Sequence, residues 1–219
     1  MAARPRESSL RRNASAGAPH RRTRRNHHAP KVKVSGAGRT LKATAYHEAG
    51  HVVASHLEKL PLRSVTILPA GDATGACSHA NVLRGRDIRW DTSSDVSRLQ
   101  MERLVIVALA GEAAQWHFDK RGTRSHQAAA DRHQATDLVS LFTGGPAELD
   151  AYLKLLALRT DRLLNEPFVW DQVTAVAEAL LAEQTIGAGR LEKIIRTARE
   201  DAVQRLLAAR ALGGPLPGE

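Results

Sequence analysis

Two histidines four residues apart are the residues of this sequence whose types and spacing point most directly to chemistry. Residues 44–53 read TAYHEAGHVV, with Glu48 directly after His47 and three residues before His51. Side chains four apart on a helix lie on one face, so both imidazoles can reach one metal ion. Glu48 can reach a metal-bound water without occupying a coordination position. The pattern is the H-E-x-x-H arrangement of two histidine ligands and a general base.

A catalytic zinc ion takes three protein ligands and keeps one position for water, whose pKa falls to about 7. Glu48 can then accept the proton of that water as it attacks a carbonyl group. The five-residue pattern is weak by itself, because the chain has ten histidines. A helical histidine pair can also pack in a core or lie on a surface.

The motif does not fix the third ligand. A histidine six residues after His51 would suit one class of zinc peptidase, but residue 57 is leucine. His56 is one residue away from that position and would point to another part of the helix. Another class uses an acidic side chain on a later helix. Three residues are candidates by position: Glu102, Glu112 and Asp131.

The elements that must position these residues are mostly helical. Leu41, Ala45, Ala49 and Val52 share one helical face, which predicts a helix from an N-cap at Thr40 to about residue 59, before a proline. Further helices are predicted at 94–118, 126–142, 146–165, 168–184 and 189–209, and the apolar 94–118 helix should be central. Strand-forming residues at 65–68 and 75–82, joined by the turn PAGD, predict a hairpin or small sheet.

Five segments resemble, in order, the peptidase domain of the FtsH family, the ATP-dependent zinc metalloproteases. They read ATAYHEAGHVVASHL, SVTILPAGDATG, RLVIVALAGEAAQ, AAADRHQATDLV and WDQVTAVAEALLAEQTIGAGRLEKII, and they lie within residues 40–200. The resemblance implies a mainly α, FtsH-type zinc peptidase fold with a small β-hairpin or sheet. It also implies His47, His51 and Asp131 as zinc ligands and Glu48 as the catalytic base.

The resemblance further implies that the strand near residues 73–80 binds the substrate backbone at a sheet edge. The predicted substrate-binding residues are Thr74, Gly75, Ala76 and Cys77. Main-chain hydrogen bonds do not read side chains, which suits a peptidase of low sequence specificity.

The chain departs from the family pattern around the site. Glu112 stands where the family usually has arginine, Gln115 where it has the first of two glutamates, and Ala130 where an asparagine often precedes the third ligand. All four residues implied as ligands and base are present. The departures concern groups that support ligands, whose loss can cost ten- to a hundredfold in activity or metal affinity.

Charge is concentrated at the N-terminus. The 219 residues carry a net charge of +9, but residues 1–40 alone hold eleven Lys or Arg and one acid, so the remainder is at −1, the difference between +9 and +10. Residues 1–37 contain almost no large apolar side chains and are predicted to be a disordered tail. Such a tail suits contact with nucleic acid or an anionic surface, and it also resembles an organelle transit peptide.

These observations divide the chain into the tail, a metallopeptidase domain at 38–210 and a flexible C-terminal tail at 211–219. The single cysteine, Cys77, fits a reducing compartment and predicts a cytoplasmic protein. Neither a transmembrane segment nor a phosphate-binding loop of the G-x-x-x-x-G-K-(S/T) type is evident, which predicts a free-standing peptidase domain without its own ATPase.

The predicted function is a zinc-dependent endopeptidase that hydrolyses peptide bonds in unfolded proteins or peptides. A separate ATPase or adaptor would then deliver folded substrates, and self-assembly is a further hypothesis because FtsH domains form hexamers. The alternative is a weak or inactive FtsH-like scaffold that binds a partner, with the basic tail contacting nucleic acid or an anionic surface.

Overall fold

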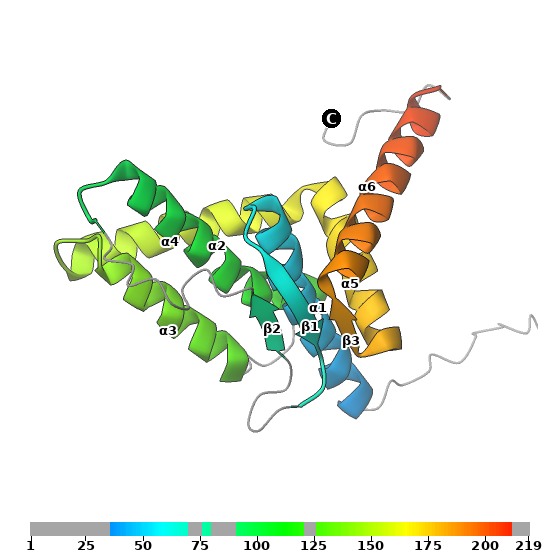
Figure 1. Ribbon diagram of the computed structural model, residues 1–219, viewed down its shortest axis with the longest axis horizontal. Helices are drawn as coiled ribbons and strands as arrows, with labels where there is room; N and C mark the ends of the chain where they lie inside the picture. The colour runs from blue at the N-terminus through cyan, green and yellow to red at the C-terminus, as the bar shows by residue number, and fades with distance from the viewer. Residues whose placement is uncertain (1–35, 70–75, 80–90, 121–125, 212–219) are drawn as a thin grey trace, which may run out of the picture. The chain divides into compact units, whose positions relative to one another are not determined.

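A computed structural model of the chain describes residues 36–69, 76–79, 91–120 and 126–211 (Figure 1). The described residues form six α-helices and three short β-strands, which confirms the prediction of a mainly α fold with a small β element. The predicted tail at 1–37 lies outside the described residues except for its last two positions. Thr74, Gly75 and residues 212–219 also lie outside them.

The elements follow one another in a simple order. They are α1 (Gly36–Leu57), β1 (Leu62–Thr66), β2 (Ala76–His79), α2 (Asp95–Phe118), α3 (His126–Ser140), α4 (Pro146–Asn165), α5 (Pro167–Glu183), β3 (Thr185–Gly187) and α6 (Ala188–Ala211). Pro146 and Pro167 stand at the starts of α4 and α5, where a missing N–H costs nothing. None of the described helices is long and apolar enough to cross a bilayer.

Helix α1 begins four residues before the predicted start. Thr40 therefore does not cap the helix, and its carbonyl oxygen accepts a hydrogen bond from the hydroxyl of Thr44 inside it. At the other end the N–H of Leu60 donates to the carbonyl of Ser55 at 2.8 Å, and the N–H of Lys59 donates to that of His56 at 3.3 Å. This pair of bonds is a Schellman motif, and it places Lys59 in the left-handed region with φ 60°.

Helix α2 is central, as its apolar sequence predicts, because it contributes to two apolar cores. Val107, Ala110 and Ala114 pack with residues of α1, α5, α6, β1 and β3. Met101, Val105 and Ala108 pack with α3 and α4 in the second core. Helix α1, which carries His47 and His51, thus packs against one side of α2. Helix α3, which carries Asp131, packs against another side.

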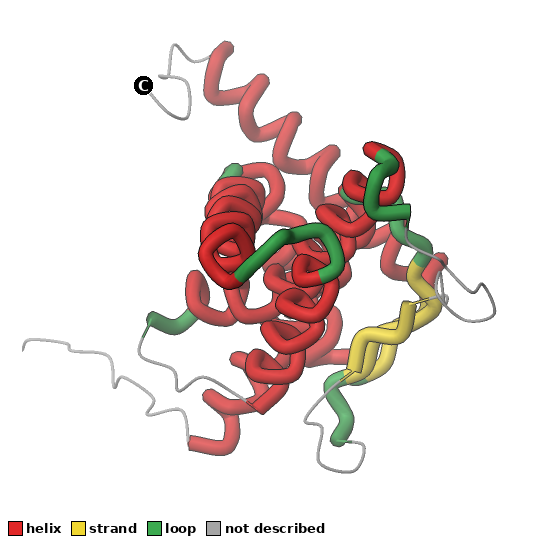
Figure 2. Tube along the Cα trace, turned by 90° about the vertical axis from the view of Figure 1, so that its left-hand side faces the viewer, coloured by secondary structure: helices red, strands yellow, loops and turns green. Residues whose placement is uncertain are grey.

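The sheet has the strand order β2-β1-β3, with both pairs antiparallel. Figure 2 shows the strands together at one side of the helices. Val65 in β1 lies opposite Cys77 of β2 and Ile186 of β3. Strand β1 starts three residues before the predicted range, and β3 was not predicted. Its three residues are too short for a readable alternation, and it forms because β1 offers a free edge to a segment distant in sequence. Among the described strands, β2 lies at one edge of the sheet and β3 at the other.

Candidate metal centre

Three side chains from two helices converge on one point. His47 and His51 come from α1 and Asp131 comes from α3, and their ligand atoms lie within 4.8 Å of one another. The two Nε2 atoms are 3.1 Å apart. Asp131 Oδ2 lies 3.0 Å from Nε2 of His47 and 3.3 Å from Nε2 of His51. The cluster has the two-histidine, one-carboxylate composition of a catalytic zinc site.

The carbonyl of Val107 in α2 fixes the tautomer of His51. It lies 2.7 Å from Nδ1 of the imidazole, and because a carbonyl can only accept, Nδ1 donates. In the neutral ring Nε2 is then unprotonated and directs its lone pair toward His47 and Asp131. A histidine that ligates a metal is typically held in this way through its second nitrogen.

Gly111 provides the space in which the two rings meet. A Cβ atom at this position would lie 2.3 Å from Nε2 of His51 and 2.8 Å from Cε1 of His47. Both imidazole rings would have to move before any side chain could fit at position 111. Gly111 therefore shapes the cluster although it offers no ligand atom.

Helices α1 and α2 approach closely beside the cluster. A Cβ on Gly50 would lie 2.4 Å from the carbonyl oxygen of Ala110 and 2.7 Å from Cβ of Ala114. Small residues at the crossing thus bring the α2 backbone near enough for Val107 and Gly111 to contact the histidines. Tyr46 of α1, the residue before His47, stacks on Phe118 of α2, with ring centroids 4.0 Å apart.

The three ligand atoms fit a metal ion. A tetrahedral zinc with bonds of about 2.0–2.1 Å places its ligands about 3.3 Å apart, and the observed separations of 3.0, 3.1 and 3.3 Å are within a few tenths of this value. Asp131 Oδ2 is buried without a hydrogen bond of ordinary geometry to any described group. Such an atom, facing two imidazole nitrogens, requires a cation or a shared proton.

The charges of the cluster shift its pKa values in opposite directions. Burial lowers the pKa of His47. Burial also acts to lower the pKa of His51, but Asp131, Glu48 and the Val107 carbonyl outweigh it and raise that pKa. Burial acts to raise the pKa of Asp131, yet the two imidazoles hold this pKa well below its usual range. Asp131 is thus the anionic member of the cluster.

Glu48 is almost completely buried in α1, with 2% of its surface exposed, and its charge acts on His51. The cluster itself is most accessible at Asp131, whose side chain is 21% exposed against 2% for His47 and 9% for His51. The side of the cluster formed by α3 is therefore more open to solvent than the side formed by α1.

The other two acidic candidates are engaged elsewhere. Glu102 accepts hydrogen bonds from Tyr152 and, at 2.7 Å, from Arg159. Glu112 is bound at 2.5 Å by Arg132, the residue directly after Asp131. Glu112, which departs from the family pattern, therefore ties α2 to α3 beside the cluster.

His47 lacks a comparable support. No hydrogen bond of ordinary geometry from a described residue reaches its Nδ1, although Gln115 lies close enough to favour the protonated ring. Gln115, where the sequence departs from the family pattern, thus lies beside one of the two histidines of the cluster.

Sequence reasoning missed two contributors to the cluster, Val107 and Gly111. Val107 acts through its backbone and leaves no trace in the side-chain pattern. Gly111 was open to detection, because a lone glycine inside an apolar helix marks a close approach. Of the predicted substrate-binding residues, Ala76 and Cys77 lie in β2, whereas Thr74 and Gly75 lie outside the described residues.

Comparisons with known proteins point to one class, the ATP-dependent zinc metalloproteases. The chain is 28% identical over 193 residues to ATP-dependent zinc metalloprotease FtsH 4 of Sphaerobacter thermophilus, which covers 70% of this chain and 28% of that protein. It is 27% identical over 189 residues to ATP-dependent zinc metalloprotease FTSH 9, chloroplastic/mitochondrial, of Oryza sativa subsp. japonica, which covers 74% of this chain and 23% of that protein. No protein-family model matches the sequence.

This weak similarity supports a relation to the FtsH zinc metalloproteases. The matched region spans about a quarter of the length of these relatives. The His-His-Asp cluster is consistent with the metal that their names specify.

Proposed function

We propose that the protein is a zinc-dependent endopeptidase related to FtsH, acting on unfolded proteins or peptides. The observation that carries the proposal is the meeting of His47 and His51 with Asp131, which comes 80 residues after His51, at separations that suit zinc. The similarity to FtsH proteins supports the same reading.

The proposed roles follow from the positions of the side chains. His47, His51 and Asp131 would hold the metal, and Val107 and Gly111 would fix the rings that do so. A bound zinc ion supplies Lewis-acid activation of water and of the carbonyl group. The carboxylate of Glu48 accepts a proton from the attacking water and later donates it to the leaving amine.

The substrate class is proposed from the sheet. An extended peptide can add to β2 through main-chain hydrogen bonds, with Ala76 and Cys77 at the pairing edge. This mode needs an unfolded segment and reads little of its sequence. Folded substrates would require a separate ATPase or adaptor to open them.

Metal content tests the ligand set. Zinc per chain would be measured after dialysis in the wild type, in Asp131→Ala and in the matched control Asp161→Ala on α4. We expect about one zinc in the wild type and the control and much less in Asp131→Ala. Little zinc in the wild type after metal is added back would reject the proposed site.

Casein cleavage tests the activity. We expect the wild type to cleave unfolded casein, Glu48→Gln to lose this activity while keeping its zinc, and Glu178→Gln on α5 to behave as the wild type. Cleavage that persists in Glu48→Gln would contradict the proposed base. A wild type that holds zinc but cleaves no peptide would instead support the scaffold hypothesis.

A further inference from the structure

A groove of about 400 Å³ lies at the C-terminal end of α1, away from the α2 and α3 residues that complete the metal cluster. The start of α5 and one face of α6 complete its walls. Its surface is mainly apolar and includes Leu57, Phe168, Val169 and Val203. The volume lies within the range of about 300–1,000 Å³ that is usual for binding pockets.

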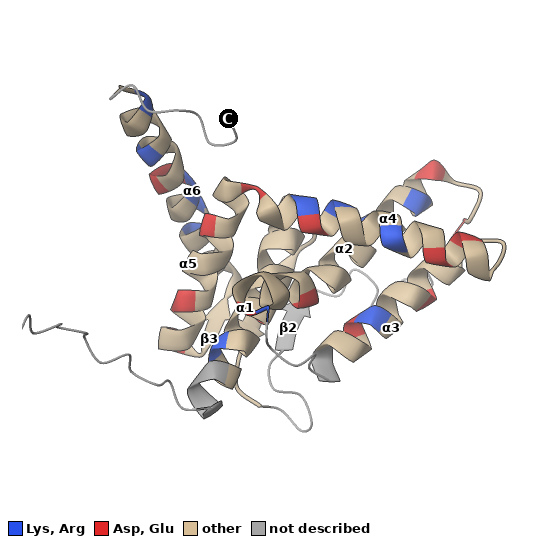
Figure 3. Ribbon diagram, turned by 180° about the vertical axis from the view of Figure 1, so that it is seen from behind, with Lys and Arg blue, Asp and Glu red and all other residues tan. Residues whose placement is uncertain are grey.

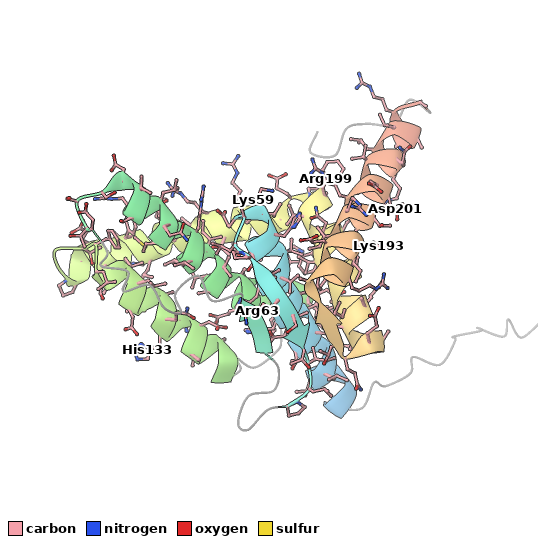
Figure 4. All side chains as sticks on the ribbon, in the orientation of Figure 1. Lys59, Arg63, His133, Lys193, Arg199 and Asp201 are labelled. Carbon is pink, nitrogen blue, oxygen red and sulfur yellow. The ribbon has the colours of Figure 1, made fainter. Side chains whose placement is uncertain are left out.

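Two cations flank the apolar surface. Lys59, just after the end of α1, and Arg199, near the middle of α6, both line the groove, and Figure 4 shows them near one another. Neither forms an ion pair with another described residue, whereas Arg190, Arg196 and Arg205 of the same helix α6 all do. Acidic and basic side chains both occur along α6 (Figure 3).

The groove has a net positive environment. His56, which also lines it, has its pKa lowered by burial and then by Lys59 and Arg199, and Glu192 is the acidic group that opposes them. Of the charged groups that act on His56, two are cations and one is a carboxylate, so this end of the groove is positive while His56 is neutral. Arg196 and Glu200 of the adjoining hollow form an ion pair and do not change this balance. A carboxylate-bearing ligand would be attracted to this end of the groove.

Two exposed apolar side chains extend the groove along α6. A second hollow of about 330 Å³ shares Arg199 and Val203 with the first, and its other lining residues are Arg196, Glu200 and Gln204. Val203 is 39% exposed, and Leu207, one turn further along, is 53% exposed. The combined surface is elongated, which favours a peptide segment over a compact small molecule.

The backbone of Lys59 adds an independent observation. Lys59 has a φ of 60° and stands just past the helix C-cap, where glycine is usual. A side chain in this conformation costs roughly 1 kcal/mol of folding free energy. Glycine would be less strained at this position, which is consistent with a role for the charge of Lys59.

We propose that this groove binds an acidic amphipathic segment of a partner protein. Apolar side chains of the segment fill the space between Leu57, Phe168 and Val203 and continue onto Leu207. Its carboxylates face Lys59 and Arg199. The proposal is independent of peptidase activity and would hold for a scaffold as well.

Fluorescence anisotropy on the full chain tests the proposal with labelled synthetic peptides. The probe is a helical peptide of about 18 residues with leucines spaced three and four apart and glutamates elsewhere, at about 0.15 M salt. One control replaces each leucine with serine, and another replaces each glutamate with lysine. We expect micromolar binding of the first peptide and at least about tenfold weaker binding of both controls.

Charge reversal locates the binding. We expect Lys59→Glu/Arg199→Glu to bind the acidic peptide at least about tenfold more weakly and to gain affinity for the lysine peptide. The matched variant Lys42→Glu/Arg162→Glu, which changes the same residue types on α1 and α4, should bind as the wild type. Circular dichroism would verify that both variants fold.

Methyl NMR distinguishes this groove from a separate groove of about 550 Å³ between α2 and α4. Trp116 and Leu158 line that separate groove. We expect the peptide to shift the methyl signals of Leu57, Val169 and Val203. Shifts confined to Leu158, equal binding of the leucine-free peptide, an unaffected charge-reversal variant, or no binding at about 1 mM would each overturn the proposal.

Discussion

The middle of α1 carries His47, Glu48 and His51 in a buried cluster, whereas its C-terminal end carries His56 and Lys59 at an exposed groove. His51 lies six residues before Leu57, the last residue of α1, or about 9 Å along the helix. In the cluster, polar atoms meet one another at 3.0–3.3 Å in a space shaped by glycine. In the groove, cations face solvent without a described ion-pair partner.

The difference shows how burial decides what a polar residue needs. A buried charge is costly unless neighbouring groups are placed to within a few tenths of an ångström, so the cluster depends on shape. An exposed charge is screened by water and salt. Binding at the groove should therefore depend more on the sign of the charges than on their exact positions. Substitutions in the cluster should therefore have large steric effects, and substitutions at the groove should have small ones.

The largest effect is expected for Gly111→Ala. Its Cβ would lie 2.3 Å from Nε2 of His51, so we expect zinc affinity to fall by more than about 100-fold and the metal-free protein to lose about 1–3 kcal/mol of stability. Metal titration and chemical denaturation measure the two quantities. Gly189→Ala, where nothing lies within 4 Å, should instead stabilise by about 0.5–1 kcal/mol. Wild-type behaviour of Gly111→Ala would show that the cluster is less tightly shaped than described.

A smaller loss is expected for Arg132→Ala. Arg132 binds Glu112 at 2.5 Å and so holds α3 against α2 next to Asp131. We expect zinc affinity to fall about tenfold, while stability changes by less than about 1 kcal/mol because the pair is partly exposed. Competition with a chromophoric chelator measures the affinity. The exchange Glu112→Arg/Arg132→Glu should restore most of it, and a failure to do so would argue against the ion pair as the cause.

A gain is expected for Gln115→Glu. A carboxylate beside His47 can accept a hydrogen bond from Nδ1, which has no partner of ordinary geometry among the described residues. We expect zinc affinity to rise about three- to tenfold in the same chelator assay. Gln204→Glu on the exposed face of α6 controls for the added charge. An equal rise in both variants would mean that net charge, and not the histidine, is responsible.

The smallest effect is expected for Lys59→Gly at the groove. Glycine removes the cost of φ 60°, so we expect a stabilisation of about 0.5–1 kcal/mol and unchanged zinc affinity. Denaturant unfolding measures this. Lys193→Gly inside α6 should lose about 1 kcal/mol, because there glycine only adds chain entropy. A destabilised Lys59→Gly would show that the lysine side chain contributes to folding at this position.

Much of the fold was predictable from local patterns. The ranges of α2, α4 and α5 follow from helical periodicity and from Ser94, Pro146 and Pro167 at their starts. The first turn of α1 and the strand β3 did not follow, because Gly36 begins a weak helix-forming stretch and β3 depends on pairing with β1. Local propensity carries no information about a partner strand more than a hundred residues away.

The sequence by itself determined that His47 and His51 share one face and that Glu48 lies between them, because helical spacing is a local property of the chain. The resemblance to FtsH peptidases also pointed to Asp131 as the third metal ligand. Residue spacing alone left Glu102 and Glu112 as equally good candidates for that ligand. The tertiary structure decided among these by packing α3 against α2, which brings Asp131 to the histidines and binds Glu112 to Arg132. The close crossing of α1 and α2 likewise gave Gly111 and the Val107 carbonyl their roles, because both act through distances between backbones.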